Sequence, residues 1–384
     1  MSYQGPPPRR RPPPHHPTPP RHPMSPRHPT QQRYPTPPPR HPRAGQPPPT
    51  RVTRPIHPAQ PPARPRRRRR PGRALGVLLG VLLLAVIGIA GYVERSLQRV
   101  DALAGYPGRI ADTAGTNWLI VGSDSRAGLT PDQAARLTTG DEVGAGGRRT
   151  DTIMLMHIPA LVGDGTPTLV SLPRDSSVPV PGQGRIKLNA AYAFGGPTLL
   201  VQTVETVTGV RVDHYAEIGF SGFANLVDDV GGVQLCPTEP ISDPLAGLEI
   251  PAGCQLLDGP QALGYVRTRN SPRADLDRVV RQREFLGALV ARASSPTVLL
   301  NPFRAGPLAV DAPDTVTVDD GGHVWNLARL GWALRALSGG DAVTTTVPIA
   351  GFSRMSDGSS GVLWDREQAG RLFDALAQDR PVPH

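Results

Sequence analysis

The chain has almost no lysine. Its 384 residues include one lysine, Lys187, among 42 basic residues, so the other 41 are arginines. Alanine, glycine and proline are abundant, which is typical of a GC-rich coding bias that uses arginine wherever either cation will serve. A compact ammonium and a planar guanidinium are not interchangeable at a shaped site. Lys187 is therefore a candidate functional residue.

Acidic residues are absent from residues 1–73, which contain 17 arginines. The rest of the chain holds 25 basic against 32 acidic residues, so the formal charge of +10 comes from this amino-terminal part. Proline and arginine dominate it and large apolar residues are scarce, which predicts a disordered Pro/Arg-rich tail over residues 1–73. Because the basic excess is confined to this tail, no nucleic-acid partner is expected.

Long apolar runs are missing too, with one exception at residues 74–93, ALGVLLGVLLLAVIGIAGYV. At ~1.5 Å per residue this uncharged segment can cross a ~30 Å hydrocarbon core. The arginine run Arg66 to Arg70 precedes it, and only Glu94 and Arg95 follow closely. A core helix does not usually carry such a flank, and a signal peptide would not follow so long a proline-rich tail. The positive-inside rule predicts a single-pass cell-membrane protein, with a cytoplasmic amino terminus and an extracellular domain.

Cysteine is nearly absent: Cys236 and Cys254 are the two in the sequence, and both follow the apolar segment. No CxxC or Cys/His spacing typical of zinc occurs. An even count in an oxidising compartment favours one disulfide, and two buried thiols are the alternative. GxSxG, HExxH and P-loop motifs are also missing, so acyl transfer, zinc proteolysis and ATP hydrolysis lack support.

Strand and helix patterns alternate after residues 94–115, which are expected to form a tether. Strands are predicted at 117–122, 152–158, 168–172, 214–218, 265–269 and 344–349. Helices are predicted at 131–137, 197–208, 221–230 (with Ser221 as cap), 258–263, 275–293 and 324–337, and after Asp365. This alternation predicts an α/β domain over residues 116–384, with a mixed central sheet and helices on both faces, an αβα sandwich.

Charged residues gather where predicted strands meet loops, which is where an α/β sheet places its chemistry. These residues are Asp124 and Arg126, Arg149 and Asp151, and Arg174. Arg267 and Arg269 lie two apart on a predicted strand and would share a face. On the next helix Arg278 and Gln282 share a polar face.

Such a set of arginines indicates a site for phosphate groups, because guanidinium groups bind phosphate oxygens bidentately. Asp124 and Asp151 could share a hard divalent cation, Mg²⁺ or Mn²⁺, with those phosphates. Taken singly, each residue has a plainer interpretation. An arginine can cover surface, and an aspartate can hold a turn.

Seven segments in unbroken order carry a family resemblance over about 117–295. They are GSDSR at 122–126, RTDTIML at 149–155, SLPRDSSVPVPG at 171–182, KLNAAYAFGG at 187–196, HYAEIGFSGF at 214–223, YVRTR at 265–269 and DLDRVVRQREF at 275–285. Together they resemble the LytR-CpsA-Psr family. Residues 296–384 match no motif of that family that we can quote.

The resemblance implies a membrane-anchored phosphotransferase that moves a glycan from a polyprenyl-pyrophosphate carrier onto a peptidoglycan acceptor. It implies a metal-binding and catalytic role for Asp124 and Asp151. The implied further catalytic residues are Arg149, Arg267, Arg269 and Arg278, and the implied substrate-binding residues are Arg126, Arg174, Lys187 and Gln282. Two alternatives remain: a polyprenyl-pyrophosphate hydrolase, or a non-catalytic polyprenyl-lipid carrier or regulatory membrane protein.

Overall fold

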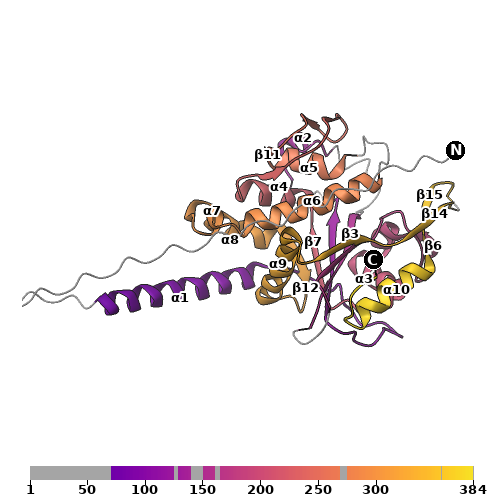
Figure 1. The fold of residues 1–384 in the computed structure, drawn as a ribbon, viewed down its shortest axis with the longest axis horizontal. Helices are drawn as coiled ribbons and strands as arrows, with labels where there is room; N and C mark the ends of the chain where they lie inside the picture. The colour runs from indigo at the N-terminus through magenta and orange to yellow at the C-terminus, as the bar shows by residue number, and fades with distance from the viewer. Residues whose placement is uncertain are drawn as a thin grey trace, which may run out of the picture. The chain divides into compact units, whose positions relative to one another are not determined.

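A computed structural model of the chain describes residues 71–124, 129–139, 150–160, 165–268, 275–355 and 357–383. Within these residues a seven-stranded mixed sheet forms the centre of the fold (Figure 1). Its strands, in spatial order, are β1 (Gln98–Val100), β12 (Val316–Asp319), β7 (His214–Ile218), β2 (Thr116–Ser123), β3 (Thr150–Ile158), β4 (Thr168–Ser171) and β13 (Val343–Thr346). The β1–β12, β7–β2 and β4–β13 pairs are parallel, and the other three are antiparallel.

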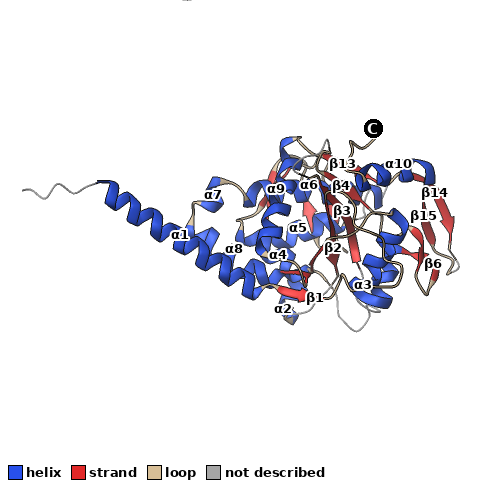
Figure 2. Cartoon of the chain, turned by 90° about the horizontal axis from the view of Figure 1, so that it is seen from below, coloured by secondary structure: helices blue, strands red, loops and turns tan. Residues whose placement is uncertain are grey.

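Helices cover both faces of this sheet (Figure 2). One face carries α3 (Leu188–Thr208) and α10 (Arg366–Ala377), which pack on Leu119 and Val121 of β2. The other face carries α4 (Phe220–Asp229), α5 (Gly259–Arg267), α6 (Asp275–Ala293) and α9 (Val324–Gly339), and there Trp118 is buried. Since alternate strand residues point to opposite faces, β2 is apolar on both sides, as a central strand requires. The predicted αβα sandwich is confirmed.

Four two-stranded pairs decorate the sheet within the described ranges. They are β5 (Ser177–Val180) with β6 (Gly184–Lys187), β8 (Val233–Leu235) with β11 (Gln255–Leu257), β9 (Ile241–Asp243) with β10 (Leu248–Ile250), and β14 (Ile349–Arg354) with β15 (Ser360–Trp364). The described residues also include the helices α2 (Pro131–Arg136), α7 (Pro296–Leu299) and α8 (Pro302–Thr315).

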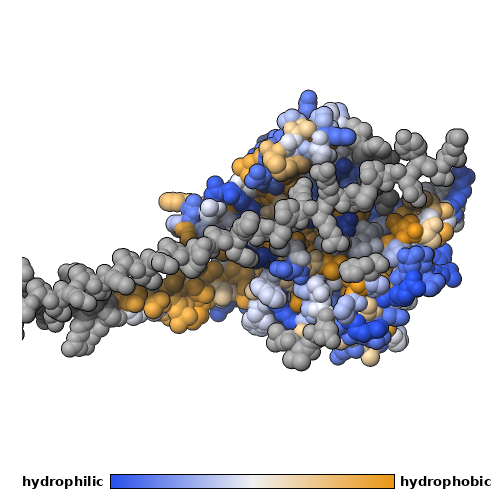
Figure 3. Space-filling view, viewed as in Figure 1, coloured by the Kyte–Doolittle hydropathy of each residue, from blue (hydrophilic) through white to orange (hydrophobic). Residues whose placement is uncertain are grey.

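The apolar segment forms the helix α1 (Pro71–Ser96). Its stretch Leu75–Ser96 is long and apolar enough to cross a membrane. Its surface is largely hydrophobic (Figure 3). The structure thus contains the candidate membrane helix expected at 74–93. The tail preceding it lies, up to residue 70, outside the described residues.

The expected tether at 94–115 is part of the domain. Within it, β1 pairs with β12 at the edge of the sheet. Further along, Tyr106 and Arg109 donate hydrogen bonds to the carboxylate of Glu205 on α3, whose side chain is fully buried. Arg109, which lies in the expected tether, thus neutralises this buried carboxylate together with Arg211.

The strand predicted at 265–269 is wrong, because Gly259–Arg267 forms the helix α5. A capping box joins Asp258 and Gln261, and a proline lies in the first turn. These helix-initiating signals outweigh the modest strand preference of Tyr265 and Val266. Arg267 is therefore in the last turn of a helix and not on a strand.

Two helix starts also differ from their predictions. Gly219, rather than Ser221, is the N-cap of α4. The helix predicted at 197–208 is the second part of α3, which begins at Leu188 and is kinked at Gly195 and Gly196. Gly196 has a φ of 61°, a left-handed conformation that suits glycine best.

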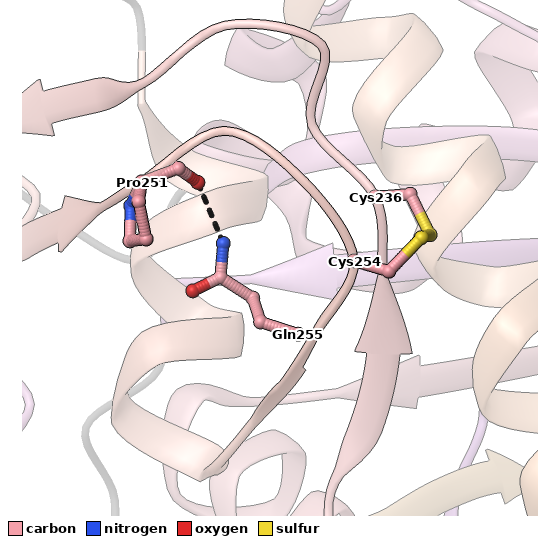
Figure 4. Close-up of a disulfide and its surroundings, with 4 residues drawn as sticks. All are labelled: Cys236, Pro251, Cys254 and Gln255. Atoms are coloured by element: carbon pink, nitrogen blue, oxygen red, sulfur yellow. Dashed lines mark hydrogen bonds between the residues drawn. A yellow bond between two sulfur atoms is a disulfide. The ribbon is translucent and has the colours of Figure 1, made fainter.

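Cys236 and Cys254 are joined by a disulfide next to the β8–β11 pair, with their Cα atoms 3.9 Å apart (Figure 4). Beside it, the Gln255 side-chain amide donates a hydrogen bond to the Pro251 carbonyl oxygen at 2.7 Å. The loop closed by the disulfide contains the β9–β10 hairpin, including Asp243.

Candidate functional site

An apolar pocket lies between the sheet and the layer of α4, α5 and α6. It encloses about 810 Å³ of empty space, including its open mouth. Its apolar lining consists of Ile120, Met154, Ile218, Phe220, Phe223, Leu226, Leu263, Val266, Phe285, Leu286 and Leu289. Phe223 and Phe285 stack within it, with ring centroids 4.6 Å apart. The charged and amide side chains of its lining are Asp151, Arg267, Arg278 and Gln282, which we call the polar end.

Asp151 stands on an irregularity of β3. Gly122 pairs with Thr152 and Ser123 pairs with Thr150, so Asp151 is the extra residue of a β-bulge. Bulges bend a strand and re-aim a side chain, and they are frequent beside active sites. The bulge places Asp151 in the pocket lining, where its side chain is partly exposed.

Two arginines from different elements meet the carboxylate of Asp151. Arg174, in the turn after β4, forms an ion pair with it. Arg278 Nη1 lies 4.0 Å from Asp151 Oδ1, although the two residues are 127 positions apart. Arg278 is 3% exposed, so its charge is held inside the protein beside this carboxylate. The structure therefore brings together three of the predicted site residues.

Lys187, the lysine of this chain, belongs to the same cluster. Its Nζ lies 3.2 Å from Asp175 Oδ1, and Arg174 Nε lies 3.5 Å from Asp175 Oδ2. Lys187 is also the N-cap residue of α3. The backbone N–H groups of Leu188 and Asn189 donate to the carbonyls of Ser176 and Arg174, which fixes the turn against the helix start.

Helix α6 supplies Arg278 and Gln282 one turn apart, as its predicted bounds require. The Gln282 amide, which is buried, donates a 3.3 Å hydrogen bond to the Val266 carbonyl of α5. Tyr265 of α5 donates to Glu284 of α6. Burial and this carboxylate raise the pKa of Tyr265 to about 12, so its hydroxyl stays protonated and keeps the two helices together.

Arg267 approaches the pocket from the last turn of α5. Its Nη1 donates to the carbonyl oxygens of Leu137 and Thr138 at 3.2 and 3.3 Å. Its guanidinium carbon also lies 4.9 Å from the ring centroid of Phe220. A cation over an aromatic face is stabilised by about 0.5–2 kcal/mol, depending on desolvation. These backbone carbonyls and this ring help to orient Arg267.

The residues that hold the end of α5 at Arg267 and Thr268 were not identified from the sequence. Thr138 has a φ of 49°, which is rare for a β-branched residue and is found mostly at functional sites. Its carbonyl is one of those that hold Arg267. Asp243 accepts a 2.7 Å hydrogen bond from Thr268, and Arg281 donates to the Thr268 carbonyl at 2.8 Å. No sequence pattern indicates Thr138 or Asp243 as functional residues. Arg281 lies in the segment at 275–285 that carries the family resemblance, so it could have been identified.

The remaining predicted residues are only partly visible. Asp124 is the first residue after β2, next to the paired end of β3, and is half-buried. Arg126, Arg149 and Arg269 lie outside the described residues. The predictions made for these three arginines stay predictions.

The carboxylates of Asp124 and Asp151 suit a hard divalent cation that is also bound by the substrate. Asp124 and Asp151 offer carboxylate oxygens from neighbouring strand ends, which is the donor chemistry that Mg²⁺ and Mn²⁺ prefer. Among the described residues, no three His, Cys, Asp or Glu side chains gather into a complete metal site. Mg²⁺ is commonly held by one or two carboxylates plus phosphates and water, so this set fits a cation that arrives with phosphate groups.

The fold and the pocket define a class: an α/β domain behind a candidate membrane helix, with an apolar pocket that ends in arginines and a carboxylate. A profile of the LytR_cpsA_psr family matches residues 94–378. The chain belongs to this family, and the family resemblance of the sequence is confirmed.

Relatives and solved structures agree with this assignment. The chain is 54% identical over 305 residues to the "Probable cell wall biosynthesis protein LcpB" of Corynebacterium glutamicum, covering 79% of this chain and 71% of that protein. It is 38% identical over 161 residues to the "Polyisoprenyl-teichoic acid--peptidoglycan teichoic acid transferase TagU" of Enterococcus faecalis, covering 41% of this chain and 52% of that one. A LytR-Csp2A-Psr enzyme from Actinomyces oris shares the fold, with a TM-score of 0.55, 24% identity, and 73% and 96% coverage.

Proposed function

We propose that this protein is a phosphotransferase that moves a glycan polymer from a polyprenyl-pyrophosphate carrier onto peptidoglycan outside the cell membrane. The observation that carries the proposal is the pocket itself, in which an apolar lining ends at Arg278 and Arg267. A relative named as a polyisoprenyl-teichoic acid–peptidoglycan transferase supports the substrate class.

The apolar lining is suited to the polyprenyl chain. Transfer of apolar surface out of water contributes about 25 cal/mol per Å², so a long isoprenoid binds strongly to such a lining without any polar contact. The stacked pair Phe223 and Phe285 and the leucines of α6 would contact the tail. An ionic ligand without an apolar tail would not contact this apolar lining.

The polar end is suited to the pyrophosphate. Arg278 and Arg174 would bind phosphate oxygens, each with two parallel N–H donors. Both arginines face Asp151. Binding therefore exchanges an internal carboxylate for phosphate oxygens, and Lys187 would contribute charge from the side of Asp175.

Asp124 and Asp151 would hold Mg²⁺ or Mn²⁺ together with the pyrophosphate. A cation bound there would neutralise charge on the phosphate oxygens. The preorganised guanidinium groups would then stabilise the charge that develops during transfer, which is usually the largest contribution to such catalysis.

The reaction balances as a substitution at phosphorus. A peptidoglycan sugar hydroxyl forms a P–O bond to the phosphorus joined to the glycan, and the bridging P–O–P bond breaks. Polyprenyl phosphate leaves with the bridging oxygen. The hydroxyl proton is released to a carboxylate at the polar end or to water.

The membrane arrangement follows from the arginine asymmetry of the sequence. With the tail inside the cell, α1 crosses the membrane and residues 94–384 lie outside, where peptidoglycan is found. A reporter that is active only after export, fused after Leu103, should be active. The same reporter fused before Arg64 should be inactive.

A reconstitution distinguishes the three possible activities. The purified full-length chain is incubated with a polyprenyl-pyrophosphate-linked oligosaccharide, a divalent cation, and peptidoglycan oligomers. We expect release of polyprenyl phosphate together with a phosphodiester-linked glycan on the acceptor. Release without acceptor would indicate a hydrolase, and tight lipid binding without release would indicate a carrier.

A further inference from the structure

Helix α8 lies beside the membrane helix, and the pairing of two strands fixes their relative levels. α1 ends at Ser96 and leads into β1, while α8 ends at Thr315 and leads into β12. β1 and β12 are parallel neighbours with Gln98 opposite Thr317. α1 and α8 contact each other and run side by side toward the sheet (Figures 1 and 2).

The same register can be followed down both helices. Because each helix rises ~1.5 Å per residue, Ser96 and Thr315 stand level, and Pro302 stands level with about Leu83. Leu83 belongs to the apolar stretch that can cross a membrane. The turn between α7 and α8 therefore reaches about 20 Å down the membrane helix.

That turn exposes large apolar side chains. Leu300 is 81% exposed and Phe303 is 88% exposed, and Leu299 is also exposed. Gly306, Pro307 and Val310 continue the exposed side of α8 at helical spacing. We call Leu299, Leu300, Phe303 and Val310 the α8 stripe. Phe303 and Val310 lie seven residues apart on one face of α8, and Leu299 and Leu300 precede them at the end of α7.

In this region the charged side chain points into the protein and the apolar side chains point outward, the opposite of a surface in water. Arg304, the charged residue between Pro296 and Val310, turns inward, and its Nη1 donates to the Val230 carbonyl at 2.8 Å. Arg292 donates to the same carbonyl, at the carboxyl end of α4. The cations thus bind carbonyls inside, where the helix dipole favours them, and the apolar side chains face outward.

The charged boundaries of the two helices fall within one helical turn of each other. On α1 the first charges after the apolar span are Glu94 and Arg95, and on α8 they are Asp311 and Asp314. In the shared register Asp314 stands level with Arg95. Glu94 accepts a hydrogen bond from the backbone of Val324, beside the exposed Trp325, a residue type enriched at membrane–water interfaces.

We infer that the α8 stripe is inserted into the outer half of the lipid bilayer that α1 spans. The inference rests on the membrane anchoring included in the proposed function. A bilayer is the occupant that fits, because the stripe lies at the depth of the span, carries no outward charge, and ends where the charges of α1 begin. Since α4 packs on α8 and lines the pocket, insertion also places the pocket next to the leaflet that holds polyprenyl lipids.

The test uses the full-length chain in phosphatidylcholine vesicles, with a nitroxide on one introduced cysteine at a time. The variants are Phe303→Cys in the stripe, Leu83→Cys in α1, and Phe352→Cys as a matched exposed phenylalanine on β14. β14 lies at the end of the domain away from α1 (Figures 1 and 2). Collision with oxygen, which concentrates in hydrocarbon, is compared with collision with a water-soluble nickel chelate.

We expect positions 303 and 83 to collide with oxygen and to exclude nickel, and position 352 to show the reverse. If position 83 lies in lipid while position 303 meets nickel, the insertion is refuted and the membrane anchor stands. If position 83 itself meets nickel, the anchor fails and the insertion fails with it. Shielding of position 303 from both reagents would mean that protein, such as a second copy, covers the stripe, which also refutes insertion.

Discussion

Arg174 and Asp151 form an ion pair at the polar end of the pocket, between the turn after β4 and the bulge of β3. Arg278 approaches the same carboxylate from α6. Asp151 thus neutralises two guanidinium groups that the fold already holds in one place. We therefore expect a phosphate group that binds here to replace the carboxylate of Asp151 as the partner of these arginines.

Replacing Asp151 with asparagine tests this exchange. Asp151→Asn keeps the shape and removes the charge, so inorganic pyrophosphate should bind more tightly in the absence of a divalent cation. The gain should be on the order of tenfold, a modest share of a Coulomb energy of ~4 kcal/mol at 4 Å near a protein surface. Transfer should nevertheless be lost, together with its dependence on the cation.

The measurement is calorimetric titration with pyrophosphate in a metal chelator, followed by the transfer assay. Asp374→Asn, on the exposed side of α10, is the control and should change neither. Full cation-dependent transfer by Asp151→Asn would contradict the assignment of Asp151 as a metal ligand.

Phe223→Ala distinguishes binding of the lipid tail from binding of the pyrophosphate head group. Phe223→Ala removes one ring of the stacked pair in the pocket. Affinity for the polyprenyl substrate should fall by about 1.5–3 kcal/mol, the value of one buried aromatic side chain. Affinity for inorganic pyrophosphate should not change.

A lipid-binding titration of Phe223→Ala, with the exposed Phe352→Ala as control, checks this expectation. Equal losses for lipid and pyrophosphate would mean that the whole site is distorted. No loss for the lipid would mean that the tail binds elsewhere.

The disulfide should stabilise the turn that carries Arg267. Its loop includes Asp243, which accepts a hydrogen bond from Thr268, the residue after Arg267. Removing both cysteines with serine should cost about 3 kcal/mol of unfolding free energy by loop-entropy reasoning. Denaturant unfolding measures the loss, and mass mapping of the exported protein that finds two free thiols would refute the bond.

His157 should make the fold acid-sensitive. It is buried between Asn117 and Asp379, and burial lowers its pKa below the ordinary 6.5 despite the nearby carboxylate. Below pH ~6.5 the unfolded chain therefore binds a proton at this histidine that the folded chain does not bind. The contribution of His157 to the free energy of unfolding is thus fully present above pH ~6.5 and decreases as the pH falls below it. The slope approaches about 1.4 kcal/mol per pH unit for one proton.

Unfolding free energies of the wild type and His157→Gln across pH 7.5 to 5 isolate this contribution. The comparison is needed because burial raises the pKa of Asp229 to about 6, which stabilises the folded state as the pH falls in the same window. Parallel pH curves for the two proteins would rule out the role of His157.

Periodic patterns predicted most of the fold. The bounds of α6, Asp275–Ala293, agree with the prediction because its apolar stripe has strict helical spacing. Strand β7 agrees as well, since an apolar run between turn signals has few alternatives. The first half of α5 agrees with the helix predicted at 258–263, but its last turn was mistaken for a strand, because Tyr265 and Val266 prefer strands.

The candidate site was predicted as a set of residues and not as a geometry. Arg174, Arg278 and Asp151 meet, as their places at strand ends and on a helix start suggested. The bulge that aims Asp151, however, depends on the pairing of two strands, and a single strand carries no signal of it. The carbonyls that hold Arg267 come from a turn 129 residues earlier in the chain, which no local pattern indicates.

The central claim is that the arginines of the polar end stabilise the transfer of the phosphoryl-linked glycan. Arg278→Lys tests it most directly, because lysine keeps the charge and loses the planar fork. Arg136→Lys, with a side chain 65% exposed on α2, is the control. Transfer rate and polyprenyl-pyrophosphate affinity are measured for both variants, after melting curves show that they fold. Arg278→Lys should lower transfer by about 2–4 kcal/mol, as for the loss of one preorganised donor. It should lower lipid affinity by clearly less, because the tail still binds the apolar lining. Unchanged transfer, or equal losses in transfer and binding, would contradict the account.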